Sequence, residues 1–204
     1  DSDTTSSDLI TFSSAIGGTA AIGTIAIGTA TLGGDANFGS TVGATALNIT
    51  AGDASGENAG GVFVGTATIT TLTLTANAAN ANTDATAEFQ AATSALAATT
   101  IVLDDASSNG TAELTINTAN GATAVTGTID GGAAGEGTLI ITDDDTAAAA
   151  QAATISGNVG ASNSLLAVNV GLTGDTTASS AIFSGSVSAT TISLSGGNQE
   201  LETS

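Results

Sequence analysis

The stretch FVGTATITTLTL at residues 63–74 links one phenylalanine to a run in which threonine alternates with isoleucine or leucine. Alternation with a period of two is typical of a β-strand that buries one of its faces. Related phrases occur at residues 38–49, FGSTVGATALNI, and at residues 183–194, FSGSVSATTISL. A phrase that recurs in this way indicates a structural unit that the chain uses repeatedly.

The phenylalanines set the length of this unit. The first four of the five stand at positions 12, 38, 63 and 89, and two further steps of nearly the same length reach Leu114 and Leu139. After Asp143 the spacing changes, and Ile155 and the fifth phenylalanine resume the pattern. In a solenoid, equivalent residues of successive repeats lie above one another. We therefore predict one interior column that consists of Phe12, Phe38, Phe63, Phe89 and Phe183.

A second interior column is predicted from the pair of apolar residues that ends each phrase. One residue separates the two members of a pair, so both face the same side of a strand. After Phe89 the pair is displaced by a short insertion. The pairs are Leu47 and Ile49, Leu72 and Leu74, Ile101 and Leu103, and Ile192 and Leu194.

These patterns predict an all-β chain that folds as a right-handed parallel β-solenoid (β-helix) of about seven to eight coils, with roughly 25 residues in each coil. Each coil is expected to be triangular, with three short strands. An antiparallel sandwich is the alternative, but it would require regularly spaced Asn-Gly or Asp-Gly turns. We expect residues 9–197 to form a single solenoid domain, with an irregular coil near residues 143–154, a polar N-terminal extension at 1–8 and a polar C-terminal tail at 198–204.

The composition excludes several classes of function. The chain has 19 Asp and Glu residues but no Lys, Arg, His or Cys, which gives a net charge of −19. Without basic residues it lacks the groups that bind nucleic acids or anionic membrane surfaces. Without His or Cys it offers no zinc, haem, iron–sulfur or thiol chemistry. The mean hydropathy of +0.34 and the recurring alternation argue against a disordered chain.

Two phrases carry a resemblance to a known kind of repeat. ISGNVGASNSLLAVNV at residues 155–170 and FSGSVSATTISLSGG at residues 183–197 resemble the repetitive parallel β-helix segments of large bacterial surface proteins, including autotransporter passengers and S-layer-like or adhesin repeats. The resemblance covers about two-thirds of the chain. It implies an extracellular or cell-surface setting and no catalytic residues. No apolar run in the sequence has the length that crosses a membrane.

Two clusters of aspartates are the candidate metal ligands. Calcium binds carboxylate and carbonyl oxygens that loops supply, but the spacing here matches neither an EF-hand loop nor a calcium-binding nonapeptide repeat. We favour acidic, solvated turns and expect no cofactor other than calcium. Divalent cations are also expected to screen the negative charge collectively. The five residues are Asp104, Asp105, Asp143, Asp144 and Asp145.

Neither catalysis nor ice binding is favoured. Some β-helix enzymes hydrolyse glycosides with paired carboxylates, but this chain has no basic side chain, Trp or Tyr to hold a sugar substrate. We therefore expect no enzymatic activity. An ice-binding array requires threonines on the same face of successive coils, and one step of the phenylalanine spacing from Thr71 reaches Leu96 or Ala97. The threonine array is therefore predicted to end there.

The ends of the solenoid decide between the remaining functions. The end coils of a solenoid present unpaired backbone edges and an open apolar core, and the first and last residues of this chain encode no evident cap. Our leading hypothesis is a structural subunit of an extracellular filament or matrix fibre, in which copies of the chain join head to tail. The alternatives are a passive stalk segment of a large cell-surface adhesin and an ice- or surface-binding solenoid.

Overall fold

The computed structural model describes residues 9–77, 83–90, 96–105, 110–119, 121–143, 151–172, 178–196 and 199–203. These residues form sixteen β-strands in two sheets of eight, and they contain no helix. The odd sheet consists of β1 (Leu9–Phe12), β3 (Gly34–Phe38), β5 (Ala59–Phe63), β7 (Asp84–Phe89), β9 (Thr111–Asn117), β11 (Glu136–Thr142), β13 (Leu165–Val170) and β15 (Ala189–Leu194). The even sheet consists of β2 (Ile22–Ile27), β4 (Val42–Thr50), β6 (Ala67–Ala76), β8 (Leu96–Asp105), β10 (Thr123–Gly131), β12 (Ala152–Ile155), β14 (Ser180–Phe183) and β16 (Glu200–Thr203).

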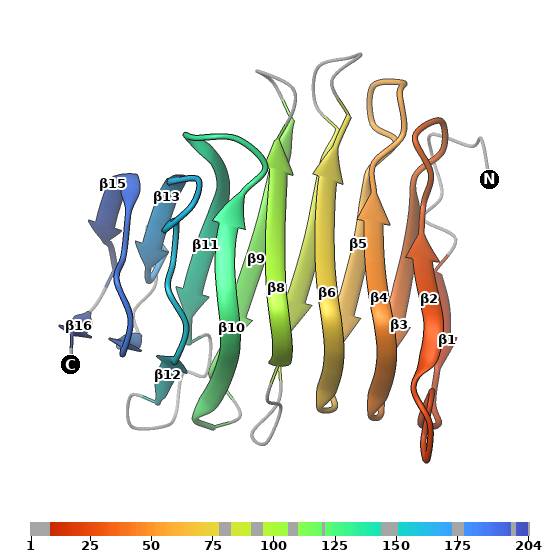
Figure 1. Cartoon of the computed structure of the whole chain (residues 1–204), viewed down its shortest axis with the longest axis horizontal. Coiled ribbons are helices and arrows are strands. Elements are labelled where there is room, and N and C mark those ends of the chain that lie inside the picture. Colours follow the sequence, from red (N-terminus) through yellow and green to blue (C-terminus); the bar gives the residue numbers. More distant parts are fainter. Residues whose placement is uncertain are drawn as a thin grey trace.

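The chain alternates between the two sheets, so each strand pairs with the strand two places before it and the strand two places after it. Every pair of named strands is parallel. In Figure 1 the even sheet lies in front and its strands run upward, the odd sheet lies behind and runs downward, and the chain advances from right to left. This winding is right-handed. The predicted right-handed parallel β-solenoid is therefore confirmed.

Four phenylalanines form an interior column in the odd sheet. Phe12 pairs with Phe38, Phe38 with Phe63, and Phe63 with Phe89. Their rings are stacked, with centroids 5.2, 4.7 and 4.6 Å apart and planes within 12° of parallel. Beyond Phe89 the step lengthens, so Leu114 and Leu139, which a constant step reaches, lie in the neighbouring column. The column continues through Ile116, Ile141, Val170 and Leu194.

Phe183, the fifth phenylalanine, lies in the even sheet, where it pairs with Ile155. Along the chain it falls roughly midway between Val170 and Leu194, two successive members of the phenylalanine column. A half step moves a residue to the opposite sheet, so the assignment of Phe183 to the phenylalanine column was wrong.

The apolar pair that follows Phe183 is displaced in the same way. The pairs on β4, β6 and β8 align with one another in the even sheet, as their spacing predicted. Ile192 and Leu194 instead lie in β15 of the odd sheet, opposite Val168 and Val170. The phrase at residues 183–194 therefore repeats the sequence pattern of its relatives half a turn out of phase.

Each coil has two strands rather than the three that we predicted. The long strands β4, β6 and β8 nevertheless contain two runs of buried residues. Between the runs, two consecutive residues face outward, namely Thr45 and Ala46 on β4, Thr70 and Thr71 on β6, and Thr99 and Thr100 on β8. Two successive outward residues change the phase of the alternation, so the strand bends around the core where we expected a separate corner.

The turns between strands are held by close backbone contacts and by side chains that reach the next coil. Gly17 has a φ of 69°, and a Cβ atom at this position would lie 2.0 Å from the carbonyl oxygen of Gly43. On the odd sheet, Asn58 Oδ1 accepts a hydrogen bond of 2.9 Å from the N–H of Asp84. Asp84 Oδ1 in turn accepts hydrogen bonds from the N–H and the hydroxyl of Thr111, at 3.1 and 2.9 Å. These bonds link three successive coils where β5, β7 and β9 begin.

The predicted boundaries are described only in part. Residues 1–8, predicted as a polar extension, lie outside the described residues. So do residues 144–150 of the predicted irregular coil, after which β12 continues the even sheet. Within the predicted polar tail, β16 pairs with β14 and is part of the solenoid.

Candidate functional site

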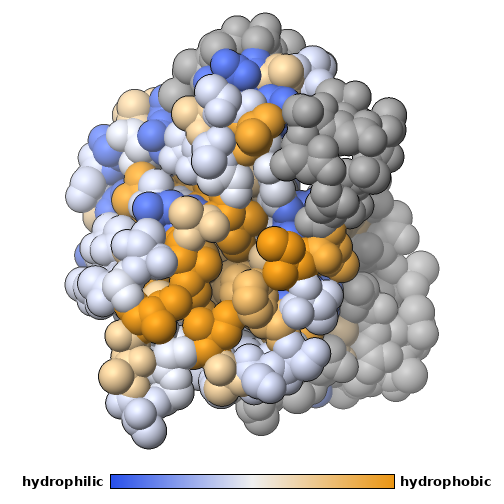
Figure 2. Space-filling view, turned by 90° about the vertical axis from the view of Figure 1, so that its right-hand side faces the viewer, coloured by the Kyte–Doolittle hydropathy of each residue, from blue (hydrophilic) through white to orange (hydrophobic). Residues whose placement is uncertain are grey.

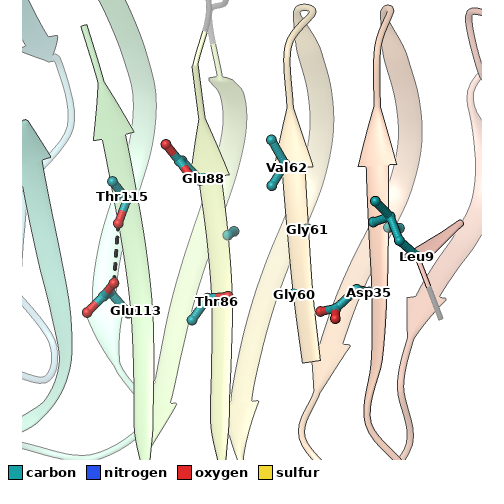
Figure 3. Close-up of a pocket in the computed structure, with 11 residues that line it drawn as sticks. Leu9, Asp35, Gly60, Gly61, Val62, Thr86, Glu88, Glu113 and Thr115 are labelled. Atoms are coloured by element: carbon teal, nitrogen blue, oxygen red, sulfur yellow. Dashed lines mark hydrogen bonds between the residues drawn. The ribbon is translucent and has the colours of Figure 1, made fainter. Parts of the chain in front are cut away.

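The outer face of the odd sheet carries a hollow of about 330 Å³ that extends from Leu9 on β1 across β3, β5 and β7 to β9 (Figure 3). One outward column passes along it in the order Asp35, Gly60, Thr86 and Glu113. Gly60 has no side chain, and the side chains of Asp35 and Thr86 lean over it, since a Cβ atom there would lie 2.8 Å from Asp35 Oδ1 and 3.1 Å from Thr86 Oγ1. Glu88 contributes a third carboxylate to the lining. The polar part of this hollow is therefore acidic, without any basic side chain to balance it.

Burial changes the acidity of three carboxyl groups. Burial raises the pKa of Glu113, and the neighbouring carboxylates of Asp84 and Glu88 raise it further. The Thr115 hydroxyl donates a hydrogen bond of 3.4 Å to Glu113 Oε1, which lowers this pKa and opposes the effect of burial. Burial also raises the pKa of Asp35 against a hydrogen bond from the Gly60 backbone. On β8, burial and the carboxylate of Glu136 raise the pKa of Asp104.

We predict that the folded protein loses stability as the pH rises above about 4, the ordinary pKa of a carboxyl group. A carboxyl group whose pKa is raised by folding binds more protons in the folded state than in the unfolded state. The free energy of unfolding therefore decreases as the pH rises from the ordinary pKa through the raised one. Repulsion within a chain of net charge −19 acts in the same direction. Thermal melts followed by circular dichroism should show a midpoint several degrees higher near pH 4.

Two variants separate the buried carboxyl group from the general charge effect. Glu113→Gln should flatten the dependence of the melting temperature on pH, whereas Glu202→Gln, at an exposed position on β16, removes the same charge and should leave the slope nearly unchanged. Equal slopes for the two variants would contradict the assignment to Glu113.

Of the predicted calcium ligands, the structure describes Asp104, Asp105 and Asp143, and these belong to no group of three possible metal ligands among the described residues. Asp104 and Asp105 end β8, and Asp143 follows β11, where its Oδ2 accepts a 3.3 Å hydrogen bond from the N–H of Gln151. Asp144 and Asp145 lie outside the described residues. In the part of the chain that the structure describes, no three His, Cys, Asp or Glu side chains are grouped to hold a metal ion.

Threonines on the even sheet stay in register further than we predicted. Thr71 pairs with Thr100, and Thr100 with Thr128. The step from Thr71 to Thr100 is longer than the phenylalanine step, because the insertion that displaces the apolar pair on β8 also displaces its threonines. Ala46 occupies the same column on β4, so this row of threonines spans three strands. The prediction that the array ends after Thr71 was wrong.

The two ends of the solenoid expose apolar side chains. Figure 2 views the end that carries β1 and β2 and shows hydrophobic residues gathered there. They include Leu9, Ile10, Phe12 and Ile22, with exposed fractions of 54%, 59%, 38% and 39%. At the opposite end β15 exposes Ile192 and Leu194. Among the described strands, β1, β2, β15 and β16 each pair on one side only, so each leaves an unpaired edge.

Comparisons with known proteins add nothing to this geometry: no family model, no curated protein and no solved structure matches the chain. The described residues include no helix that is long and apolar enough to cross a membrane.

Sequence reasoning had not found the hollow on the odd sheet. Its signal was Gly60, which shares a column with Asp35 and Glu113 only after the neighbouring coils are aligned.

Proposed function

We propose that this chain is a structural, non-catalytic subunit of an extracellular filament or matrix fibre, in which copies of the chain join head to tail as a continued solenoid. One observation carries the proposal: apolar side chains are exposed at both ends of the described solenoid. The extracellular setting rests on the resemblance to bacterial surface repeats.

An open solenoid end favours association with another chain. The unpaired N–H and C=O groups of an edge strand are a template for a further strand, and a contiguous apolar patch gains stability when it leaves water. Natural solenoids cover these ends with polar capping repeats. The described residues include no helix and no strand beyond β1, β2, β15 and β16 that could cover either end. A second copy at each end would cover both surfaces at once.

Charge favours thin filaments over bundles. Each copy carries 19 negative charges and no Lys, Arg or His, so the long sides of neighbouring rods repel one another. An end-to-end joint is also opposed by this repulsion, but it gains apolar burial and backbone hydrogen bonds. Because salt screens charge over about 10 Å at 0.1 M and about 3 Å at 1 M, assembly should increase with ionic strength. Divalent cations would act as partners of the filament by screening its negative charge.

Electron microscopy of the purified chain tests the proposal. Negatively stained samples at micromolar protein should show unbranched filaments that lengthen as the NaCl concentration rises from about 0.01 to about 1 M. Oriented filaments should give an X-ray reflection at about 4.8 Å along the fibre axis. The strands run across this axis, and neighbouring strands are spaced about 4.8 Å apart along it. Short rods of one length at every salt concentration would overturn the filament function and favour a passive stalk.

A second candidate function is binding to an ordered surface such as ice. The observation that favours it is the aligned row of Thr71, Thr100 and Thr128 on the outer face of the even sheet. Ice-affinity or thermal-hysteresis measurements of the chain test this candidate. The absence of any effect would remove it.

A further inference from the structure

Both ends of the odd sheet expose the same two interior columns. At one end, the inward-facing residues of β1 are Ile10 and Phe12. At the other end, the inward-facing residues of β15 are Ile192 and Leu194, with exposed fractions of 47% and 50%. The register of the successive strands places Ile10 and Ile192 at the two ends of one column, and Phe12 and Leu194 at the two ends of the next.

The order of the strands lets one copy follow another without a change of winding. The first described strand, β1, belongs to the odd sheet, and the last described strand, β16, belongs to the even sheet. The next strand of a continued solenoid belongs to the odd sheet, on the free edge of β15. A second copy that places its β1 there continues the alternation of sheets and keeps the right-handed path (Figure 1).

We propose that the joint between copies is an in-register, parallel pairing of β15 of one copy with β1 of the next. In this joint Leu194 packs against Phe12, and Ile192 packs against Ile10. On the outer face, Ser193 lies beside Thr11, because both belong to the column that contains Asn37 and Asn169. This inference rests on the proposed filament function and specifies the partner surface and its register.

The side chains select this register over its neighbours. A shift of one residue would place the inward-facing Ile192 and Leu194 beside outward-facing residues of β1, so the interiors of the two copies would not join. A shift of two residues would leave one apolar residue of each strand without an apolar partner. Only the in-register joint continues both columns. Eight strands at about 4.8 Å then give a subunit repeat of about 38 Å along the filament.

Engineered cysteines test the register, since the chain has no cysteine of its own. Adjacent parallel strands place paired Cα atoms about 4.8 Å apart, within the range of about 4.4–6.8 Å that disulfides span. Filaments of Thr11→Cys/Ser193→Cys should therefore yield a ladder of covalent oligomers on non-reducing gels after mild oxidation. In the matched control Thr11→Cys/Thr191→Cys the two residues are offset by about 6.6 Å along the strands and should give no ladder.

The outcomes distinguish the joint from the filament function. A ladder from the first variant and none from the control supports the register. Filaments that form normally but yield no ladder, or a stronger ladder from the control, overturn the register and leave the filament function intact. Absence of filaments from the unmodified chain overturns both.

A charged variant checks the apolar contact independently. Leu194→Asp should abolish filaments while the melting temperature of the monomer stays close to that of the parent chain, because this side chain is half exposed in the single copy. Thr190→Asp, also exposed on β15, adds the same charge outside the two columns and should leave filaments in place at high salt. Filaments that persist in Leu194→Asp would overturn the proposed packing.

Discussion

Replacing Phe63 with alanine should lower the free energy of unfolding by about 3–5 kcal/mol. Phe63 is fully buried, and its ring stacks on Phe38 at 4.7 Å and on Phe89 at 4.6 Å. Alanine would remove both ring contacts and leave a cavity between two flat surfaces that cannot close without moving the coils. Urea unfolding followed by circular dichroism measures the loss as a lower midpoint with an unchanged slope.

Phe12→Ala is the matched control for this experiment. Phe12 is the outermost ring of the same column, stacks only on Phe38, and is 38% exposed. Its replacement should cost no more than about 1–1.5 kcal/mol, because less apolar surface is lost and water can fill the space. Similar losses in the two variants would mean that the stack contributes little to stability.

The phenylalanine column shows how far sequence reasoning could reach. A regular step along the sequence corresponds to a full turn in space, so Phe12, Phe38, Phe63 and Phe89 could be aligned by counting alone. Counting failed for Phe183, since a phrase that fits one sheet also fits the other and residue numbers do not separate a whole turn from a half turn. Strands of both sheets bury alternate residues in the same way.

Changes in coil length explain the other errors. A constant step took Thr71 to Leu96 or Ala97, but the real step from β6 to β8 is longer and leads to Thr100. The outer columns of the solenoid are sensitive to such changes because a single inserted residue exchanges inward and outward positions. The apolar pair on β8 already revealed this insertion. Adding the same inserted residues to the step from Thr71 would have predicted Thr100 and so the array of threonines.

Open ends were expected of a solenoid, but the acidic hollow and the side chains that each end exposes could not be predicted, because both depend on neighbours in space. Glu113 lies close to Glu88 and Asp84 although both belong to the preceding coil and are distant from it in the chain. Ile10 and Ile192 are ordinary strand residues in the sequence, and they differ from their buried equivalents because they lie on the outermost described strands of the odd sheet.

Gly137→Ala is expected to destabilise the protein by about 3–4 kcal/mol, even though it adds a single methyl group. Gly137 is a buried residue of β11 with a φ of 76°, in the left-handed region that costs other residues about 1–2 kcal/mol. A Cβ atom would also lie 2.3 Å from the Cβ of Leu103, which is fully buried in β8 of the other sheet. The odd and even sheets approach closely at this point, so neither side can yield without loss of packing.

Gly135→Ala separates the two causes. Gly135 also has a positive φ, 85°, but the nearest atom to its added Cβ would be the Thr190 hydroxyl oxygen at 4.0 Å. Only the backbone strain remains, so the loss should be about 1–2 kcal/mol. If urea unfolding gave equal losses for the two variants, the close approach of β11 to Leu103 would not constrain the fold. A larger loss for Gly137→Ala would show that the narrow interior, built with glycine and alanine at such contacts, sets the spacing of the two sheets.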